Sequence, residues 1–402
     1  MLKSTNELSI VPDIGITMSQ MNNLVKKTRK LILSASTVAI LLYAPYSLAT
    51  DEADLLKAAF TGKTEVVKEL LEKEINPNWQ NDNGFTSLMV AAQNGNTDVV
   101  NLLLDKKVYI DVQNAGGASA LIVASKNGHT DIVAALLDKD AHVDLQTTDG
   151  ITALMIAAMG GHEDIVNTLL EKGADVNRLN ENKVTALMVA SLEGHISVVN
   201  KLLAKNAKTG LQAIDETTAL YMAAQNGHTE IVEALLAKDA PTDLKAINQT
   251  TALYMASQNG HTDTVKALLT KDVAIDLIDK NEASALIMAA LYGHTEIVEA
   301  LLNKGAKIDQ KAKNGFTALI LAAQGGHTAT VETLLAKGAS INLQNDDGVT
   351  PLMWAALHGH TGVVKKLLAS GADINLKSKK DKTALEIARE PEVIKLLGAA
   401  TN

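Results

Sequence analysis

The chain of 402 residues has no cysteine and only six prolines, three phenylalanines and two tryptophans. Without cysteine there is no disulfide, and such a chain cannot be mis-crosslinked where thiols oxidise. So few large aromatic residues disfavour a conventional globular core of this size, which leaves Leu, Ala, Ile and Val to fill the interior. An ordinary globular chain of this length would divide into two or three domains, yet no Pro- or Ser-rich linker interrupts the sequence.

Recognisable catalytic motifs are also missing. The sequence has no G-x-S-x-G, H-E-x-x-H, P-loop or strand-to-helix G-x-G-x-x-G pattern. His162 and Glu163 lack the second histidine of a zinc-protease motif. Asp346 and Asp347 are adjacent, but they lie in a predicted turn, where aspartate is favoured for local hydrogen bonding. We therefore expect no enzyme, no catalytic residue and no cofactor.

What the chain does have is a strict internal period. Ten glycines lie 33 residues apart, and each of the last eight is followed by histidine: Gly62, Gly95, Gly128, Gly161, Gly194, Gly227, Gly260, Gly293, Gly326 and Gly359. A fixed interval of this size indicates one small supersecondary unit copied along the chain, each copy burying its apolar face against its neighbours. The sequence therefore predicts a solenoid, whose function lies on its surface.

Each copy is predicted to contain two helices, as residues 217–249 show. Thr218 is a good N-cap for the first helix, which Gly227 ends because glycine adopts the left-handed conformation without steric cost. The second helix carries Ile231, Val232, Leu235 and Leu236 as two i, i+4 pairs, which form a continuous apolar stripe. A polar, turn-prone stretch of about a dozen residues then leads to the next copy.

This pattern resembles the ankyrin repeat, with its 33-residue period and T-P-L-H-x-A motif. The motif positions hold Thr86-Ser87-Leu88, Thr152-Ala153-Leu154, Thr185-Ala186-Leu187, Thr317-Ala318-Leu319 and Thr350-Pro351-Leu352, with Ser119 and Ser284 replacing threonine in two copies. The resemblance implies an all-α solenoid of stacked helix-turn-helix units joined by β-turn fingers. It covers residues 50–402, with about ten to eleven repeats including a cap at each end.

The motif histidine is absent from every copy. Its position holds Met89, Ile122, Met155, Met188, Tyr221, Tyr254, Ile287, Ile320, Met353 and Glu386. We expect apolar packing to replace the hydrogen bond that this histidine would make.

The resemblance also implies a scaffold for protein recognition, which we expect to be monomeric and to bind a protein partner. A structural or envelope-organising protein without a tight partner, or an effector that acts on host proteins, is the alternative. Net charge is −9 at pH 7, and residues 1–49 hold five of the 37 basic side chains but only two of the 46 acidic ones. We interpret the lysines as solvated surface of the second helices. Nucleic acid needs a concentrated basic face, so we expect no nucleic-acid partner.

The histidines after the glycines do not predict a metal array. Successive copies should lie about 10 Å apart, whereas ligands about 2 Å from one zinc ion lie within about 4 Å of each other. We expect each histidine to open a second helix and to hydrogen-bond the backbone of the neighbouring copy. His358 and His360 are the only close pair, and no carboxylate cluster accompanies them. We therefore expect no metal site.

The candidate binding surface lies on the central copies, where a turn glycine is replaced. Gly84, Gly117, Gly150, Gly315 and Gly348 share one position before the motif threonine, but four consecutive middle copies have Lys183, Glu216, Gln249 and Glu282 there. An Asn-Gly or Asp-Gly pair accepts two positive φ values. The central copies should therefore adopt a different turn or bear strain, and they present long side chains.

Apolar residues at the end of the first helix extend this candidate surface. Leu192, Leu291 and Tyr292 stand where other copies have Gln93, Gln225, Gln258 or Asn259. Exposed apolar groups ringed by polar ones are typical of a contact site. Neutral drift after duplication of a middle unit is the alternative interpretation of both departures.

Residues 1–49 have the anatomy of a secretory signal. Lys26, Lys27, Arg29 and Lys30 precede the apolar run 31–44, and Ser47-Leu48-Ala49 offers the small residues that a signal peptidase reads. We expect cleavage after Ala49, export to the periplasm or the medium, and no stable membrane span afterwards. A start at Met18 or Met21 would give a more usual basic region, so residues 1–20 are alternatively an over-long start. The other alternative is a membrane anchor through residues 31–44, although this run is short of the ~20 residues that span a bilayer.

Overall fold

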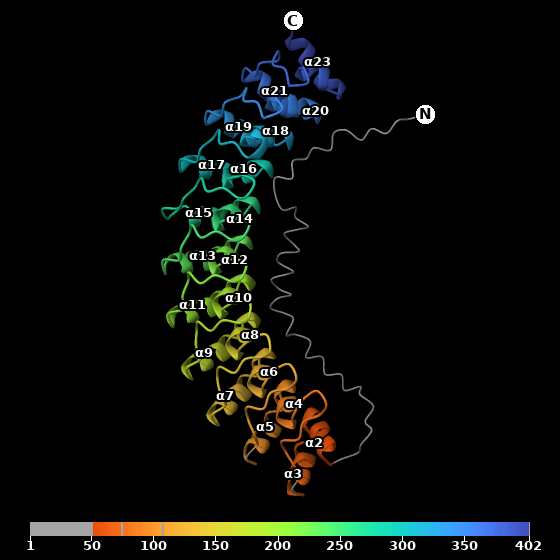
Figure 1. The fold of residues 1–402 in the computed structure, drawn as a ribbon, viewed down its shortest axis with the longest axis vertical. Helices are drawn as coiled ribbons and strands as arrows, with labels where there is room; N and C mark the ends of the chain where they lie inside the picture. The colour runs from red at the N-terminus through yellow and green to blue at the C-terminus, as the bar shows by residue number, and fades with distance from the viewer. Residues whose placement is uncertain (1–50, 74, 107, 402) are drawn as a thin grey trace, which may run out of the picture. The chain divides into compact units, whose positions relative to one another are not determined.

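The computed structural model describes residues 51–73, 75–106 and 108–401, and the expected signal segment, residues 1–49, lies outside them. The described residues form pairs of short helices that alternate along the chain, with no β-strand beyond one isolated bridge between Ile278 and Ser284. Within each compact unit in Figure 1, the even-numbered first helices lie in one row and the odd-numbered second helices beside them. The fold is thus all-α, as the period predicted.

The first helices of the pairs are α2 (Asp51–Phe60), α4 (Ser87–Asn94), α6 (Ala120–Lys126), α8 (Ala153–Gly160), α10 (Ala186–Glu193), α12 (Ala219–Gln225), α14 (Ala252–Gln258), α16 (Ala285–Leu291), α18 (Ala318–Gln324), α20 (Pro351–Leu357) and α22 (Ala384–Ile387). The second helices are α3 (Thr64–Glu72), α5 (Thr97–Leu104), α7 (Thr130–Asp138), α9 (Glu163–Glu171), α11 (Ile196–Ala204), α13 (Thr229–Leu236), α15 (Thr262–Leu268), α17 (Thr295–Asn303), α19 (Thr328–Ala336), α21 (Thr361–Ala369) and α23 (Pro391–Ala400). One 3₁₀ turn, η2, spans Lys313–Gly315.

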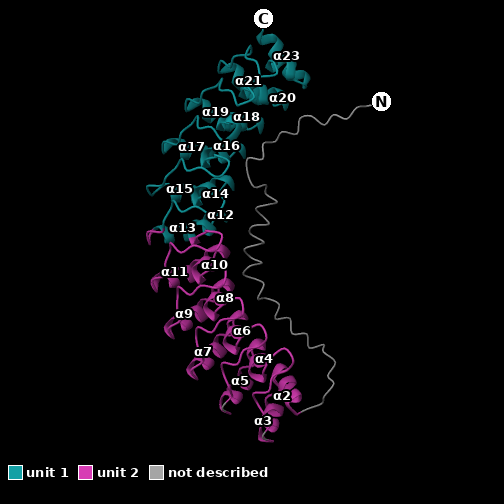
Figure 2. Ribbon diagram, viewed as in Figure 1, with its two compact units in different colours: residues 1–23, 220–236, 241–402 teal, residues 24–219, 237–240 magenta. Residues whose placement is uncertain are grey.

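The chain divides into two compact units (Figure 2). We call the described residues 51–219 and 237–240 the N-terminal unit, and residues 220–236 and 241–401 the C-terminal unit. Each unit repeats the same helix pair, so each is described from its own residues.

The motif threonine starts the first helix as an N-cap. The Thr86 hydroxyl accepts a hydrogen bond from the backbone N–H of Met89 at 3.2 Å, and Ser119 caps α6 in the same way. The helix ends at a glycine in the left-handed conformation, such as Gly95 with φ 75°. Because alanines on this helix are fully buried, Ala91 and Ala92 among them, adjacent first helices pack closely.

The second helix holds the predicted apolar stripe. Ile231, Val232, Leu235 and Leu236 of α13 are all buried, as are the equivalent residues of α7 and α9. This stripe is the interior surface of each pair, and its burial stabilises by roughly 1.5–3 kcal/mol for each large side chain.

Each finger between pairs is a three-residue turn. In the first finger, the N–H of Gly84 donates to the carbonyl of Asn81 at 2.8 Å, and the N–H of Asn81 donates to the carbonyl of Phe85 at 3.1 Å. Asn81 Oδ1 also accepts from the N–H of Asn83 and of Phe85. This is a turn followed by one left-handed residue, so it needs one positive φ value rather than the two that we expected. Within the described fingers, only the one at Lys313–Gly315 has two, at Asn314 and Gly315.

Three copies also differ from expectation at the missing motif histidine. In the last copy, Glu386 Oε2 accepts a hydrogen bond from the N–H of Thr383 at 2.8 Å, and the other two hold tyrosine. The hydroxyl of Tyr254, a side chain only 3% exposed, donates to Asp279 Oδ2 at 3.0 Å, and the hydroxyl of Tyr221 lies 2.9 Å from that of Thr250. Apolar packing therefore does not replace the hydrogen bond in these copies, because a tyrosine long enough to reach the following finger carries its own hydroxyl.

Candidate protein-interaction surface

The fingers are tied to one another by a backbone rung. In the N-terminal unit, the N–H of Ala115 donates to the carbonyl of Asn83 at 3.1 Å, and that of Ile214 to Asn182 at 2.9 Å. In the C-terminal unit, Lys313 donates to Asn281, Asp346 to Asn314 and Lys379 to Asp347, at 2.9, 2.9 and 2.8 Å. The fingers that these rungs join are therefore held in a fixed register, which makes a row of loops with outward side chains.

Glutamine side chains strengthen the same row. Gln113 Nε2 donates to the carbonyl of Gly117 in its own finger and to that of Gln146 in the next, and Gln344 does the same with Gly348 and Lys377. In three copies a lysine replaces the glutamine, and two of these lysines donate to the next copy: Lys245 Nζ to the carbonyl of Ile278 at 2.9 Å and Lys311 Nζ to that of Gln344 at 3.2 Å. The finger row is thus rigid through side chains as well as through backbone.

The four central finger residues have the predicted exposure and strain. Lys183 and Glu216 in the N-terminal unit, and Gln249 and Glu282 in the C-terminal unit, are exposed and have φ values of 57°, 63°, 67° and 61°. We expected these copies either to adopt a different turn or to bear backbone strain. They keep the turn of the other fingers, so the first alternative is wrong, and their positive φ values confirm the second. The φ values lie below the 74–78° of the glycines at this position.

The apolar residues at the end of the first helix are less exposed than predicted. Leu192 is only 5% exposed and belongs to the core of α10, so its prediction as an exposed contact was wrong. Leu291 and Tyr292 are half-buried, and the Tyr292 ring stacks on that of His294 with centroids 6.2 Å apart. Burial at this position depends on how the neighbouring copy packs, which one copy's sequence does not reveal.

Two exposed isoleucines were missed. Ile214 in the N-terminal unit is 58% exposed and Ile247 in the C-terminal unit 69%. Each is the first tip residue of its finger, a position that elsewhere in the chain holds Asp, Ala, Thr, Glu or Lys. An aliphatic residue at a turn tip could have identified both positions from the sequence.

Finger charge differs between the two units. In the N-terminal unit the tips carry Asp82, Asp149, Glu181, Asp215 and Glu216 against one lysine, Lys183. In the C-terminal unit the exposed finger charges are mixed, with Lys280, Lys313, Lys379 and Lys380 on the same fingers as Glu282, Asp346, Asp347 and Asp381. Our interpretation of the lysines as surface of the second helices was therefore incomplete, because it read charge along the chain without the register of the fingers.

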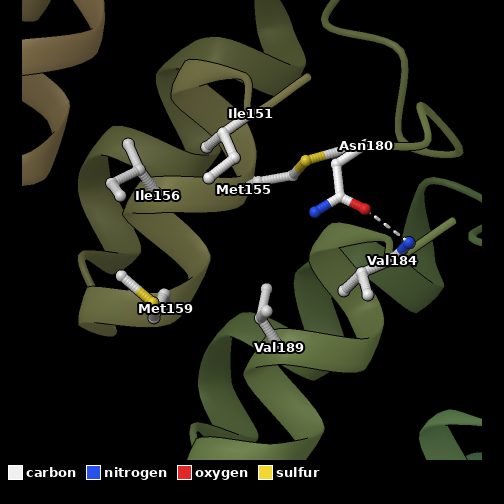
Figure 3. Close-up of a pocket in the computed structure, with 7 residues that line it drawn as sticks. All are labelled: Ile151, Met155, Ile156, Met159, Asn180, Val184 and Val189. Atoms are coloured by element: carbon white, nitrogen blue, oxygen red, sulfur yellow. Dashed lines mark hydrogen bonds between the residues drawn. The ribbon is translucent and has the colours of Figure 1, made fainter. Parts of the chain in front are cut away.

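A small void lies between α8 and α10 in the N-terminal unit. Figure 3 shows its lining, which is apolar except for Asn180: Ile151, Met155, Ile156, Met159, Asn180, Val184 and Val189. Asn180 Oδ1 accepts from the N–H of Val184 at 2.8 Å and of Asn182 at 3.0 Å. The volume of about 10 Å³ is room for a single water at most. This void is a packing gap and offers no site for an organic ligand.

The histidines after the repeat glycines have the role that we predicted. Their Nε2 atoms lie 2.9–3.3 Å from carbonyl oxygens of the first helix in the preceding copy, in His129, His162, His195, His261, His294, His327 and His360. Each stands at the N-cap of its second helix. Within the described residues, no group of three or more His, Cys, Asp or Glu side chains could hold a metal ion.

Burial lowers the pKa of two of these histidines. His261 and His294 have a lowered pKa because their rings are desolvated, and the hydrogen bonds to Gln225 and Gln258 oppose this only in part. Both rings are therefore neutral at neutral pH, which suits a structural hydrogen bond.

None of the helices in the described part of the chain is both long and apolar enough to cross a membrane.

Comparison with known proteins gives a consistent result. The family model for ankyrin repeats in sets of three matches the chain eight times, at residues 38–115, 55–147, 121–213, 187–279, 220–312, 265–345, 286–378 and 337–401. The crystal structure of the human ASB11 ankyrin repeat domain is similar, with a TM-score of 0.50 and 26% identity, covering 54% of this chain and 98% of that one. No curated protein matches the chain.

Proposed function

Because this chain belongs to the ankyrin repeat family, whose members are generally scaffolds for protein–protein interaction, we propose that it is a non-catalytic scaffold that binds a protein partner along its fingers. The observation that carries the proposal is the finger row: backbone rungs and glutamine side chains fix the loops, while the tip side chains stay exposed. A rigid row of exposed tips lowers the entropy that a partner loses on binding.

Within each unit, the fingers that lack the turn glycine are the proposed contact sites. Lys183, Glu216, Gln249 and Glu282 project from strained turns, and strained backbone persists where the surrounding structure holds it for a purpose. Leu291 at the end of α16 and its C-cap residue Tyr292 are half-buried in the C-terminal unit and offer partial apolar contact.

Capture of a partner tests the scaffold proposal. The full chain serves as bait, and the captured protein is purified and its affinity measured by calorimetry. Variants Tyr292→Ala and Gln249→Gly/Glu282→Gly should weaken binding, whereas Glu299→Ala, on the second helix α17, should not. If every variant binds the partner as tightly as the wild type, the surface is elsewhere; if no partner binds, the structural or envelope-organising role is favoured.

We also propose that the protein is exported and cleaved between Ala49 and Thr50. The order of basic cluster, apolar run and small residues in positions 26–49 supports this. Mass spectrometry of the native N-terminus checks it. An intact chain with residues 31–44 in a soluble cytosolic fraction would contradict export, and the same chain in the membrane fraction would favour the anchor. Action on host proteins is a further alternative, which the identity of the partner would decide.

A further inference from the structure

Three lysines stand at the same tip position in the C-terminal unit. Lys280, Lys313 and Lys379 are each the first tip residue of their fingers, and Asp346 takes this position in the copy between the last two. The rungs from Lys313 to Asn281, from Asp346 to Asn314 and from Lys379 to Asp347 hold these fingers in register. The charges along this edge therefore follow the fixed order positive, positive, negative, positive. We call these four residues the tip row.

The ammonium groups of the three tip-row lysines are accessible to a partner molecule. All three lysines are exposed, and among the described residues none of the ion pairs includes them. Lysines of the finger stems are instead committed: Lys311 Nζ donates to Gln344, and Lys377 Nζ lies 2.9 Å from Asp381 Oδ1. The ammonium groups of the tip lysines can therefore form ion pairs with a partner molecule.

We propose that the tip row binds an extended acidic segment of a protein partner, an inference that rests on the scaffold function above. Neighbouring copies pack about 10 Å apart, and an extended segment in the polyproline II conformation rises about 3.1 Å per residue with three residues per turn. Every third residue of such a segment lies on the same face and therefore meets the next tip. The complementary pattern is acid-x-x-acid-x-x-base-x-x-acid, in which the basic residue faces Asp346.

The negative charges between the lysines favour a peptide over nucleic acid. Asp346, Asp347 and Glu282 are all exposed on the same fingers. A duplex carries one negative charge per about 1.7 Å, so its phosphates would face these carboxylates. A peptide places its acids only opposite the lysines. The tip row therefore discriminates spaced charge from continuous charge.

We expect the tip row to contribute more to the selectivity of peptide binding than to its affinity. Exposed ion pairs contribute little each because water and salt screen them, but like charges placed opposite each other are strongly disfavoured. A peptide with the correct order of charges should therefore bind about tenfold more tightly than one with the same charges permuted. The preference should decrease with added salt.

Fluorescence anisotropy of labelled peptides tests this on the full chain. The probe is a 13-residue peptide with Glu at positions 2, 5 and 11, Lys at position 8 and neutral residues elsewhere, and its partner probe has the same charges permuted. The variant Lys280→Glu/Lys313→Glu/Lys379→Glu should lose the preference. The control Lys271→Glu/Lys304→Glu/Lys337→Glu reverses the same number of charges, 33 residues apart near the ends of second helices, and should keep the preference.

Other outcomes overturn the inference. Equal binding of both peptides, or equal loss in the control variant, would show that only net charge matters. Tighter binding of a single-stranded oligonucleotide of thymidine would assign the row to nucleic acid. A salt-sensitive dimer in sedimentation that disappears in the tip variant would assign it to a second copy of the chain. If the captured partner binds the central fingers while the patterned peptide shows no preference, the scaffold function stands and this inference fails.

Discussion

The Nε2 atom of His261 lies 3.0 Å from the carbonyl oxygen of Gln225, the last residue of α12. A carbonyl only accepts, so Nε2 carries the hydrogen. His261 is also the N-cap of α15. One side chain therefore fixes the start of a second helix to the end of the first helix in the preceding copy.

Removal of this ring should destabilise the C-terminal unit. We expect His261→Ala to lower the free energy of unfolding by about 1–2 kcal/mol, because the Gln225 carbonyl loses its donor. His261→Asn should retain most of the stability, since Asn96 already performs this task with Nδ2 bonds to Ala59 and Phe60 at 2.8 and 3.0 Å. Urea unfolding monitored by circular dichroism compares the three proteins. Equal loss in both variants would show that ring packing, not the hydrogen bond, is what matters.

The same histidines predict a loss of stability in acid. The folded-state pKa of His261 and of His294 lies below the usual value, so between the two values the unfolded chain binds more protons and stability rises with pH. Their contribution is complete above pH about 6.5 and is lost as the pH falls towards the lowered pKa. Unfolding midpoints at pH 7.5 and 5.5 measure this. The doubly substituted His261→Asn/His294→Asn should show a smaller difference than the wild type.

Period and cap chemistry were sufficient to predict the helix pairs. Thr86 and Gly95 act through their own backbone geometry and therefore behave alike in every copy. The same holds for the histidine hydrogen bond, because the repeat places each ring against the same carbonyl.

Features that depend on a neighbouring copy were not predictable. Leu192 and Leu291 hold the same position in two copies, yet one is buried and the other half-buried. The Tyr254–Asp279 bond joins residues 25 positions apart and needs the reach of one particular side chain. The period places the tip-row residues at one position of the repeat, but only the rungs show that this position is at the tips of adjacent fingers.

The Tyr254 hydroxyl should matter more than that of Tyr221. Asp279 is buried, and its carboxylate accepts from the N–H of Asn281 and of Ala283 as well as from Tyr254. Burial, followed by the charge of Asp279, raises the pKa of Tyr254, so the hydroxyl stays a donor at all ordinary pH values. Tyr254→Phe should cost about 1–3 kcal/mol because a buried carboxylate oxygen loses a donor.

Tyr221→Phe is the matched control for this substitution. The Thr250 hydroxyl that it faces still has Asn248 Oδ1 at 2.6 Å as a partner. In the same urea experiment, Tyr221→Phe should therefore lower the free energy of unfolding by less than Tyr254→Phe does. A larger loss for Tyr221→Phe than for Tyr254→Phe would contradict this account of Asp279.

The strained fingers give the last prediction. An L-residue in the left-handed region costs about 1–2 kcal/mol, whereas glycine adopts it freely but costs about 0.5–1 kcal/mol in the entropy of the unfolded chain. Gln249→Gly and Glu282→Gly should therefore each stabilise by about 0.5–1 kcal/mol.

The reverse change in an outer finger should be more damaging. Gly84 has φ 78°, and a Cβ there would lie 2.9 Å from the backbone nitrogen of Ala115. Gly84→Gln therefore combines backbone strain with a clash against the next finger, and it should destabilise by about 2 kcal/mol or more. Thermal unfolding of the single variants measures both effects. If the glycine variants lose stability while Gly84→Gln is tolerated, the central residues are not strained, and their positive φ values do not mark a surface maintained for binding.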